Sequence, residues 1–313
     1  MSLEVKVQLK DLSWLGQAFE NKSFISPLGD AKLSEFTNED KQKLINHGII
    51  KEDNTIKASY YPLLEILALA DGFIDTTFKR GPIKARKQII CQGDKKVSVV
   101  YQGEEATITM PSNPKAMAKF IGEYMGKSTL TGSDLDLELP ANEAFCLAVI
   151  TDLYRKAVFS AYAQEEVFVY TGFTKDELLK ASNKLRENSQ NLAFHVFVIN
   201  AGIPELTMEI IEEALNALIE KGLVKKENNV YRPVGEALLF AGNFLIFENI
   251  IEVVVGQVHK NNLYRSNFIL LQAGPLDVLY LEKSKDNILM ECLSPLKATE
   301  LIATVLDSKP DIV

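Results

Sequence analysis

The stretch LINHGIIKEDNTI occupies residues 44–56, and a closely similar stretch, LIEKGLVKKENNV, occupies residues 218–230. When Gly48 is aligned with Gly222, leucine, isoleucine, lysine and asparagine recur at matching positions. In both stretches a glycine follows a helical apolar pattern and precedes two apolar residues and a polar turn. This order is typical of a helix that ends at the glycine and continues into a short hairpin. The repeat therefore predicts a duplicated structural joint and does not indicate an active site.

The elements around the two stretches also recur in the same order. The helix before the glycine follows a capping threonine in both copies, Thr37 and Thr207. After the hairpin come a leucine-rich helix, several strand-like runs with a period of two, and a helix that opens with Pro114 or Pro295. This repetition predicts an α+β protein with two pseudo-symmetric halves. Each half is expected to be an antiparallel β-meander packed with helices, with a winged-helix-like element.

The repeat also sets the expected boundaries of the halves. The first α+β unit is expected to span residues 1–126, beginning with a helix over residues 7–19, and the second to span residues 141–313 with extra helices. Residues 127–140 are polar, rich in small side chains and closed by a proline, so they are expected to be a linker. The fold of residues 164–205 stays open: residues 165–172 could form a strand, a helix is expected after Thr174, and residues 192–202 fit either a strand or a helix.

Composition indicates an ordinary soluble globular protein. Of the 313 residues, 47% are hydrophobic and 24% charged, and the net charge is −8, which disfavours a phosphate-binding surface over the whole molecule. The longest apolar run, residues 237–247, is too short to span a bilayer, and the first ten residues lack a signal core. We therefore expect a cytoplasmic protein without a membrane segment.

The residues that usually carry catalysis or hold metals do not form a recognisable pattern. Histidines occur only at His47, His195 and His259, none with a carboxylate or cysteine at ligand spacing, and no phosphate-loop, dinucleotide-binding or nucleophile motif is present. Cysteines occur at three distant positions and are expected to be buried thiols: Cys91, Cys146 and Cys292. The sequence thus predicts no catalytic residues, no metal and no cofactor, and a protein that is not an enzyme.

A basic run raises an alternative function. It comprises Lys79, Arg80, Lys84, Arg86 and Lys87. These cations could contact nucleic acid in a winged-helix-related transcriptional regulator. However, no aromatic residue separates them, the matching region of the second copy is acidic and apolar, and the helix at 208–220 carries glutamates where a DNA reader needs polar or basic side chains. A strand edge or a protein-binding surface is therefore favoured over nucleic acid.

A known family has the same order of elements. The helix that runs into L-x₃-G-[LI]-[IV], the leucine-rich helix at 63–69, the basic strand, VSVVYQGEEATITM at 97–110 and a closing helix resemble one half of the EspG-type chaperones. These are cytosolic proteins associated with ESX, or type VII, secretion. The resemblance is clearest over residues 37–125 and weaker over residues 206–306. It implies two pseudo-symmetric α+β halves, no catalytic residues, and binding of helical, hairpin-like secretion substrates through exposed apolar tips.

The stretch HKNNLYRSNF at 259–268 is the candidate partner-binding segment. It is expected to be a loop that projects from the second meander, and it carries Tyr264, Arg265 and Phe268, residue types that are enriched at interface hot spots. The alternative is that Phe268 belongs to the core and the loop is merely solvated. The expected partner is a helical protein, and a homodimer is also considered.

Overall fold

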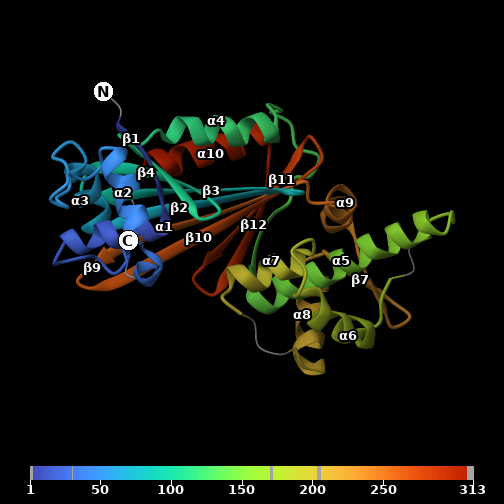
Figure 1. Ribbon diagram of the computed structural model, residues 1–313. Helices are drawn as coiled ribbons and strands as arrows, with labels where there is room; N and C mark the ends of the chain where they lie inside the picture. Colours follow the sequence, from blue (N-terminus) through green and yellow to red (C-terminus); the bar gives the residue numbers. More distant parts are fainter. Residues whose placement is uncertain (1–2, 30, 170–171, 203–205, 309–313) are drawn as a thin grey trace. The chain divides into compact units, whose positions relative to one another are not determined.

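The computed structural model describes residues 3–29, 31–169, 172–202 and 206–308, and these residues form an α+β fold (Figure 1). The α-helices are α1 (Leu9–Leu15), α2 (Asn38–Asn46), α3 (Tyr61–Ala68), α4 (Pro114–Met125), α5 (Ala141–Ala163), α6 (Lys175–Leu185), α7 (Leu192–Ile199), α8 (Met208–Glu220), α9 (Gly235–Asn243) and α10 (Pro295–Asp307). Two short 3-10 helices are η1 (Gly16–Ala18) and η2 (Leu33–Glu35). The strands are β1 (Leu3–Gln8), β2 (Gly72–Arg80), β3 (Ile83–Gln92), β4 (Lys95–Gln102), β5 (Glu105–Met110), β6 (Asp136–Pro140), β7 (Val224–Glu227), β8 (Val230–Pro233), β9 (Asn249–His259), β10 (Asn262–Ala273), β11 (Asp277–Ser284) and β12 (Asn287–Leu293).

Ten of these strands form a large antiparallel sheet, in the order β1-β5-β4-β3-β2-β9-β10-β11-β12-β6, while β7 and β8 form a separate hairpin. The strands follow the same pattern when the sheet is followed inward from either edge, β1-β5-β4-β3-β2 from one and β6-β12-β11-β10-β9 from the other. In each case the outermost strand precedes the repeated helix in the sequence, and the four strands of a meander follow it in reverse order. This matching order supports a duplication of one strand–helix–meander unit.

The chain packs into two compact units that do not follow the boundaries of the sequence repeat. Unit 1 contains residues 1–121, 252–266 and 299–313, and unit 2 contains residues 122–251 and 267–298. Most of β9, the start of β10 and most of α10 therefore belong to unit 1, although they lie in the second half of the sequence. The division into residues 1–126 and 141–313 stays a prediction about the repeat in the sequence.

In unit 1, helices cover both faces of the sheet. Alternation along the strands sends Phe78 toward α4, where its ring meets that of Phe120 edge-on at 5.5 Å between centroids. On the other face, α3 packs on β3 and β4 through a core that includes Leu64, Leu67 and Ile90. Helices α4 and α10 run side by side, as Figure 1 shows in green and red.

Unit 2 is organised around α5. Every residue from 144 to 152 is buried, which explains why this helix lacks a polar stripe, and α6, α7, α8 and α9 all pack against it. The part of 164–205 that the structure describes forms α6 and α7. The strand considered over residues 165–172 is absent from 165–169 and 172, and residues 170–171 lie outside the described residues. Among the described residues, no helix is long and apolar enough to cross a membrane.

The repeated stretch has the predicted structure in both copies. Gly48 and Gly222 end α2 and α8 with φ values of 72° and 71°, in the left-handed region that glycine adopts without strain. In each copy the glycine N–H donates to the carbonyl three residues back, and the next N–H donates to the carbonyl five residues back, at 2.9–3.0 Å. This is the helix ending that C-terminal glycines favour. The chain then turns into a single bridge between Ile50 and Ile56 in the first copy, and into the β7–β8 hairpin in the second.

These two glycines give a prediction about stability. We expect Gly48→Ala and Gly222→Ala each to lower the free energy of unfolding by about 1–2 kcal/mol. In the left-handed conformation the Cβ of an L-residue lies too close to the following carbonyl oxygen, which destabilises the fold by that amount. Chemical denaturation followed by circular dichroism measures the loss. Gly242→Ala in α9 is the matched control, since Gly242 has an ordinary φ and open space around its Cα. A loss at Gly242 equal to that at Gly222 would contradict the backbone explanation.

Three strands depart from the sequence-based expectation. The helix predicted over residues 7–19 starts only at Leu9, because residues 3–8 alternate buried and exposed side chains and pair with β5 as β1. Strand β2 begins at Gly72, directly after the leucine-rich helix, where the sequence pattern had not indicated a strand. Within the predicted linker 127–140, β6 pairs with β12 and buries Leu139. In each case a neighbouring strand stabilises a segment whose own pattern is short.

Candidate functional site

A pocket of about 370 Å³ lies on the sheet of unit 1, and we call it the sheet pocket. It is lined by Phe24, Ile25, Phe73, Asp75, Arg86, Gln88, Val254, Leu263 and Arg265. Strand geometry explains why these side chains meet. Asp75 on β2 is paired with Gln88 on β3, and residues two apart along one strand face the same way. Four strands and the loop near residue 24 therefore contribute both apolar and charged side chains to one concave surface.

Arg86 has two partners in the sheet pocket, the carboxylate of Asp75 and the ring of Tyr101. Its Nε lies 3.0 Å from both carboxylate oxygens of Asp75, and its Nη2 also donates to that carboxylate. The guanidinium lies over the ring of Tyr101, 5.1 Å from the centroid, and the Tyr101 hydroxyl donates to Gln88 at 2.9 Å. The hydrogen bonds that Arg86 donates to Asp75 raise the pKa of Arg86, while burial raises the pKa of Tyr101 to about 12. The charge of Arg86 is therefore already balanced within the protein.

Arg265 provides the available positive charge of the sheet pocket. Its side chain is exposed, and no ion pair to it occurs among the described residues. Leu263, two residues before it on β10, and Val254 on β9 place apolar surface beside the guanidinium. An arginine beside partly exposed apolar side chains is a common composition of protein-binding surfaces.

The structure separates the three residues of the candidate partner-binding segment. Residues 259–268 are not a projecting loop: Lys260 and Asn261, with φ values of 49° and 62°, form a tight turn, and β10 starts at residue 262. Tyr264 is 45% exposed but does not line the sheet pocket, because neighbouring residues on a strand face opposite ways. Phe268 is only 5% exposed and packs on the ring of Tyr280. Phe268 therefore lacks the exposed side chain that a contact residue needs, and of the three residues only Arg265 lies in the sheet pocket.

The apolar residues of the sheet pocket could not have been found from the sequence. Phe24, Phe73 and Val254 lie in three distant segments, and each has a pattern that fits an ordinary core position. Their convergence follows from strand pairing across the sheet.

The basic run does not form one cationic surface. Lys79 forms an ion pair with Glu252 at 2.7 Å, and Arg86 is paired with Asp75. Lys87 is almost buried and its Nζ donates to the carbonyl of Asn113 at 2.9 Å, and burial lowers the pKa of its ammonium group. Lys84 is exposed on β3, and Arg80 is the last residue of β2. These local partners leave little positive charge for a phosphate backbone.

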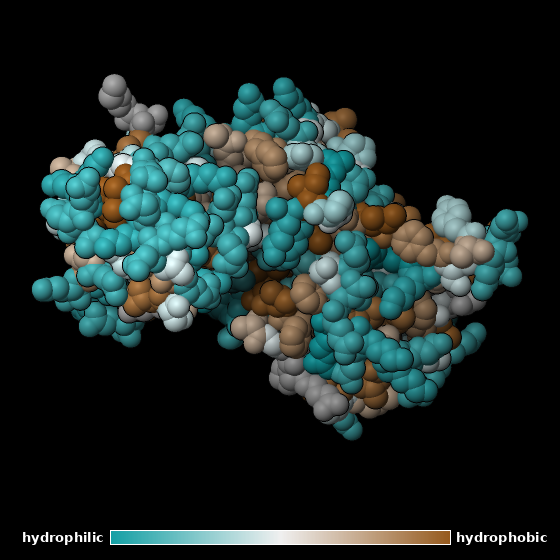
Figure 2. Space-filling view, viewed as in Figure 1, coloured by the Kyte–Doolittle hydropathy of each residue, from teal (hydrophilic) through white to brown (hydrophobic). Residues whose placement is uncertain are grey.

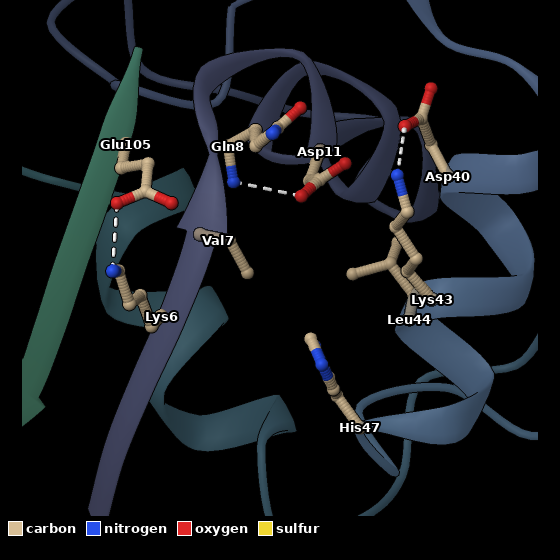
Figure 3. Close-up of a pocket in the computed structure, with 9 residues that line it drawn as sticks. All are labelled: Lys6, Val7, Gln8, Asp11, Asp40, Lys43, Leu44, His47 and Glu105. Carbon is tan, nitrogen blue, oxygen red and sulfur yellow. Dashed lines mark hydrogen bonds and ion pairs between the residues drawn. The ribbon is translucent and has the colours of Figure 1, made fainter. Parts of the chain in front are cut away.

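A second, smaller pocket of about 150 Å³ in unit 1 gathers ionisable groups (Figure 3). Its lining is Lys6, Val7, Gln8, Asp11, Asp40, Lys43, Leu44, His47 and Glu105. Asp11 accepts from the backbone N–H of Gln8 at 2.8 Å, and Asp40 accepts from the backbone N–H of Thr37 at 2.9 Å. Each carboxylate therefore caps the start of a helix, α1 or α2.

Opposite pKa shifts distinguish these two carboxylates. Burial raises the pKa of Asp11, whereas hydrogen bonds from Lys10, at 2.8 Å, and from Thr37 lower the pKa of Asp40 to about 2. Such a pair can mark an acid–base site, but capping accounts for both residues here. Within the described ranges, no group of three or more histidine, cysteine, aspartate or glutamate side chains could hold a metal ion.

Asp40 makes stability depend on pH. Its folded pKa of about 2 lies below the ordinary value of 3.8, so its stabilisation is present above pH 4 and is lost as the pH falls toward 2. We expect Asp40→Asn to be less stable than the wild type at pH 6, with the difference shrinking toward pH 2. Thermal unfolding between pH 2 and pH 6 measures this. Asp11→Asn should show the opposite trend, because the pKa of Asp11 is raised; a constant difference for Asp40→Asn at all pH values would refute the assignment.

The cysteines and histidines lie apart. Cys91 and Cys146 are buried and Cys292 is half-buried, all as free thiols, and burial raises the pKa of Cys146 and of Cys292 to about 12. Thiols held protonated in this way are poor nucleophiles. His195 is fully buried on α7 with its Nε2 2.8 Å from the carbonyl of Ser189, and His47 is exposed at the end of α2.

Comparisons with known proteins identify the fold. No protein-family model matches the sequence, and a search of curated proteins finds no relative. Among solved structures, the chain is similar to the type VII secretion system chaperone EspG5 of Mycobacterium tuberculosis, whose structure is that of a complex with a PE25-PPE41 dimer. The TM-score is 0.51 at 12% sequence identity, and the match covers 98% of this chain and 97% of the other. The protein therefore has the fold of the EspG-type chaperones of type VII secretion.

Proposed function

We propose that this protein is a non-enzymatic chaperone or adaptor that binds a helical protein partner in a type VII (ESX-like) secretion system. The observation that carries the proposal is the match to a chaperone of such a system over nearly the full length of both chains. A match of this extent includes both compact units, so it does not rest on a single common motif. The protein would act in the cytoplasm, where a secretion substrate must be kept soluble before export.

The sheet pocket, with Arg265, is the proposed contact surface of unit 1. Its apolar wall can receive a large apolar side chain of the partner, and Arg265 can pair with a carboxylate beside that side chain. Tyr264, half-exposed on the same strand, faces away from the sheet pocket, so it would contribute only to a contact on the other face of the strand. The preferred partner therefore presents an apolar residue next to an aspartate or glutamate at the end of a helix or helical hairpin.

A regulator that binds nucleic acid is the weaker alternative. Lys79, Arg86 and Lys87 already have partners within the protein. The chain as a whole carries a net charge of −8, which opposes approach to DNA.

Co-expression with the small helical-hairpin proteins encoded beside the gene tests the proposal. The products would be separated by size-exclusion chromatography and their masses measured by light scattering. A stable complex of defined mass is the expected result. If the protein stays monomeric, or pairs only with itself, in the presence of every candidate, the chaperone proposal is wrong.

A further inference from the structure

Unit 2 carries an exposed apolar surface that is separate from the sheet pocket. The last two turns of α5 extend beyond the buried part of that helix and expose Phe159 and Tyr162, by 41% and 74%. Helix α9 and the turn after it expose Leu238, Leu239 and Ile246, the last by 56%. Figure 2 shows apolar side chains gathered over α9 and the C-terminal end of α5. We call these five residues the α5–α9 surface.

The two parts of the α5–α9 surface are joined by Arg155. Its Nε donates to the carbonyl of Leu245 at 2.9 Å, and its guanidinium lies 4.4 Å from the centroid of the Phe247 ring. The turn that carries Ile246 is thereby held against α5, one helical turn before Phe159. Because Arg155 is nearly buried, this attachment is rigid, and the exposed side chains have a fixed support.

The charges around the α5–α9 surface are mostly negative. Four exposed glutamates flank it in the chain, and no ion pair to any of them occurs in the described part of the molecule: Glu165, Glu166, Glu236 and Glu248. The one exposed cation next to Phe159 on α5 is Lys156. Exposed glutamates next to apolar surface residues favour a partner whose apolar face is bordered by lysine or arginine.

The same charges disfavour a second copy of this chain as the occupant. In a two-fold dimer the same patch meets itself, so the flanking glutamates of the two copies would lie close to each other across the interface. Such like-charge contact costs free energy, and the net charge of −8 adds to the repulsion.

We propose that the α5–α9 surface binds an amphipathic helix of another protein, with its apolar stripe on Phe159, Tyr162 and Ile246 and its basic flanks against the glutamates. Helix-in-groove recognition of this kind uses apolar anchors at helical spacing. The inference deepens the proposed function, since it assigns a second class of helical contact to the protein. It rests on a different unit, so the two can fail separately.

A designed helical peptide tests the proposal. The probe is a fluorescein-labelled amphipathic peptide of about 20 residues, with leucines at i, i+3, i+4 and i+7 and lysines on the flanks. Fluorescence anisotropy with the full-length protein should show binding that weakens with salt. Tyr162→Ser should lower the affinity at least tenfold, and reversing Glu165 and Glu166 to lysine should also weaken it. A peptide with glutamates in place of the lysines should bind far less.

The controls separate this surface from general stickiness and from the proposed chaperone activity. Leu130→Ser removes another exposed apolar side chain of unit 2 and should leave peptide binding unchanged. Arg265→Glu should affect the partner complex of the sheet pocket but not the peptide. The proposal is overturned if the basic peptide does not bind, if both peptides bind equally, or if Leu130→Ser matches Tyr162→Ser. A dimer that Tyr162→Ser dissociates would assign the surface to a second copy instead.

Discussion

Replacing Asp152 by alanine is expected to lower the free energy of unfolding by about 3–5 kcal/mol, the usual cost of removing one partner of a buried ion pair. Asp152 is fully buried in the middle of α5, and its carboxylate accepts from Arg155 Nη1 at 2.6 Å. It also accepts from the backbone N–H groups of Leu192 and Ala193 at 2.9 Å, which caps the start of α7. Alanine would leave the Arg155 charge and two backbone donors without their acceptor.

Chemical denaturation of the purified variant measures this loss. Glu212→Ala is the matched control, because Glu212 is half-exposed in its pair with Lys175 and should cost less than about 1 kcal/mol. The double variant Asp152→Leu/Arg155→Met should recover part of the loss, since apolar residues of similar volume often replace a buried pair at little cost. If Asp152→Ala costs no more than Glu212→Ala, the buried pair does not hold α5 and α7 together.

Arg265→Glu is expected to weaken the complex with the helical partner by about 2 kcal/mol or more, which is about thirtyfold in Kd. The substitution replaces the available cation of the sheet pocket with an anion that repels the carboxylate expected on the partner. Isothermal titration calorimetry with the partner found by co-expression measures the change. The fold should be unaffected, because the Arg265 side chain is exposed.

Lys84→Glu is the matched control for this charge reversal. Lys84 is exposed on β3 and does not line the sheet pocket, yet the substitution changes the net charge equally. An equal loss of affinity in both variants would mean that overall charge, and not the pocket, governs binding. Salt titration of both complexes separates the two explanations further, because salt screens long-range attraction between exposed charges more strongly than a direct ion pair in a pocket.

Local sequence signals predicted the helices well. Thr37 and Thr207 accept from the backbone N–H groups three residues on, at 3.3 Å, as capping residues do. The long apolar run after Pro140 forms α5 over residues 141–163, one of the extra helices expected in the second half. Such signals work because a helix satisfies its backbone within one segment, so its limits depend on a few neighbouring residues.

The candidate site was only partly predictable. Arg265 was identified from its residue type and lies in the sheet pocket, whereas Phe268, identified on the same grounds, is buried. Both have side chains that are frequent at interfaces. They lie three positions apart on β10 and so face opposite sides of the sheet, and only the tertiary packing, in which Phe268 contacts the ring of Tyr280, decides which of them is buried.

Residues close together in the chain therefore determined the duplicated helix endings, because Gly48 and Gly222 meet the same local backbone requirement. Short strands such as β1 and β6 depend instead on partners far away in the sequence, and they form because β5 and β12 supply their hydrogen bonds. The sheet pocket has the same origin. Its walls come from segments that share no local pattern, and they meet only because strand pairing brings them onto one face of the sheet.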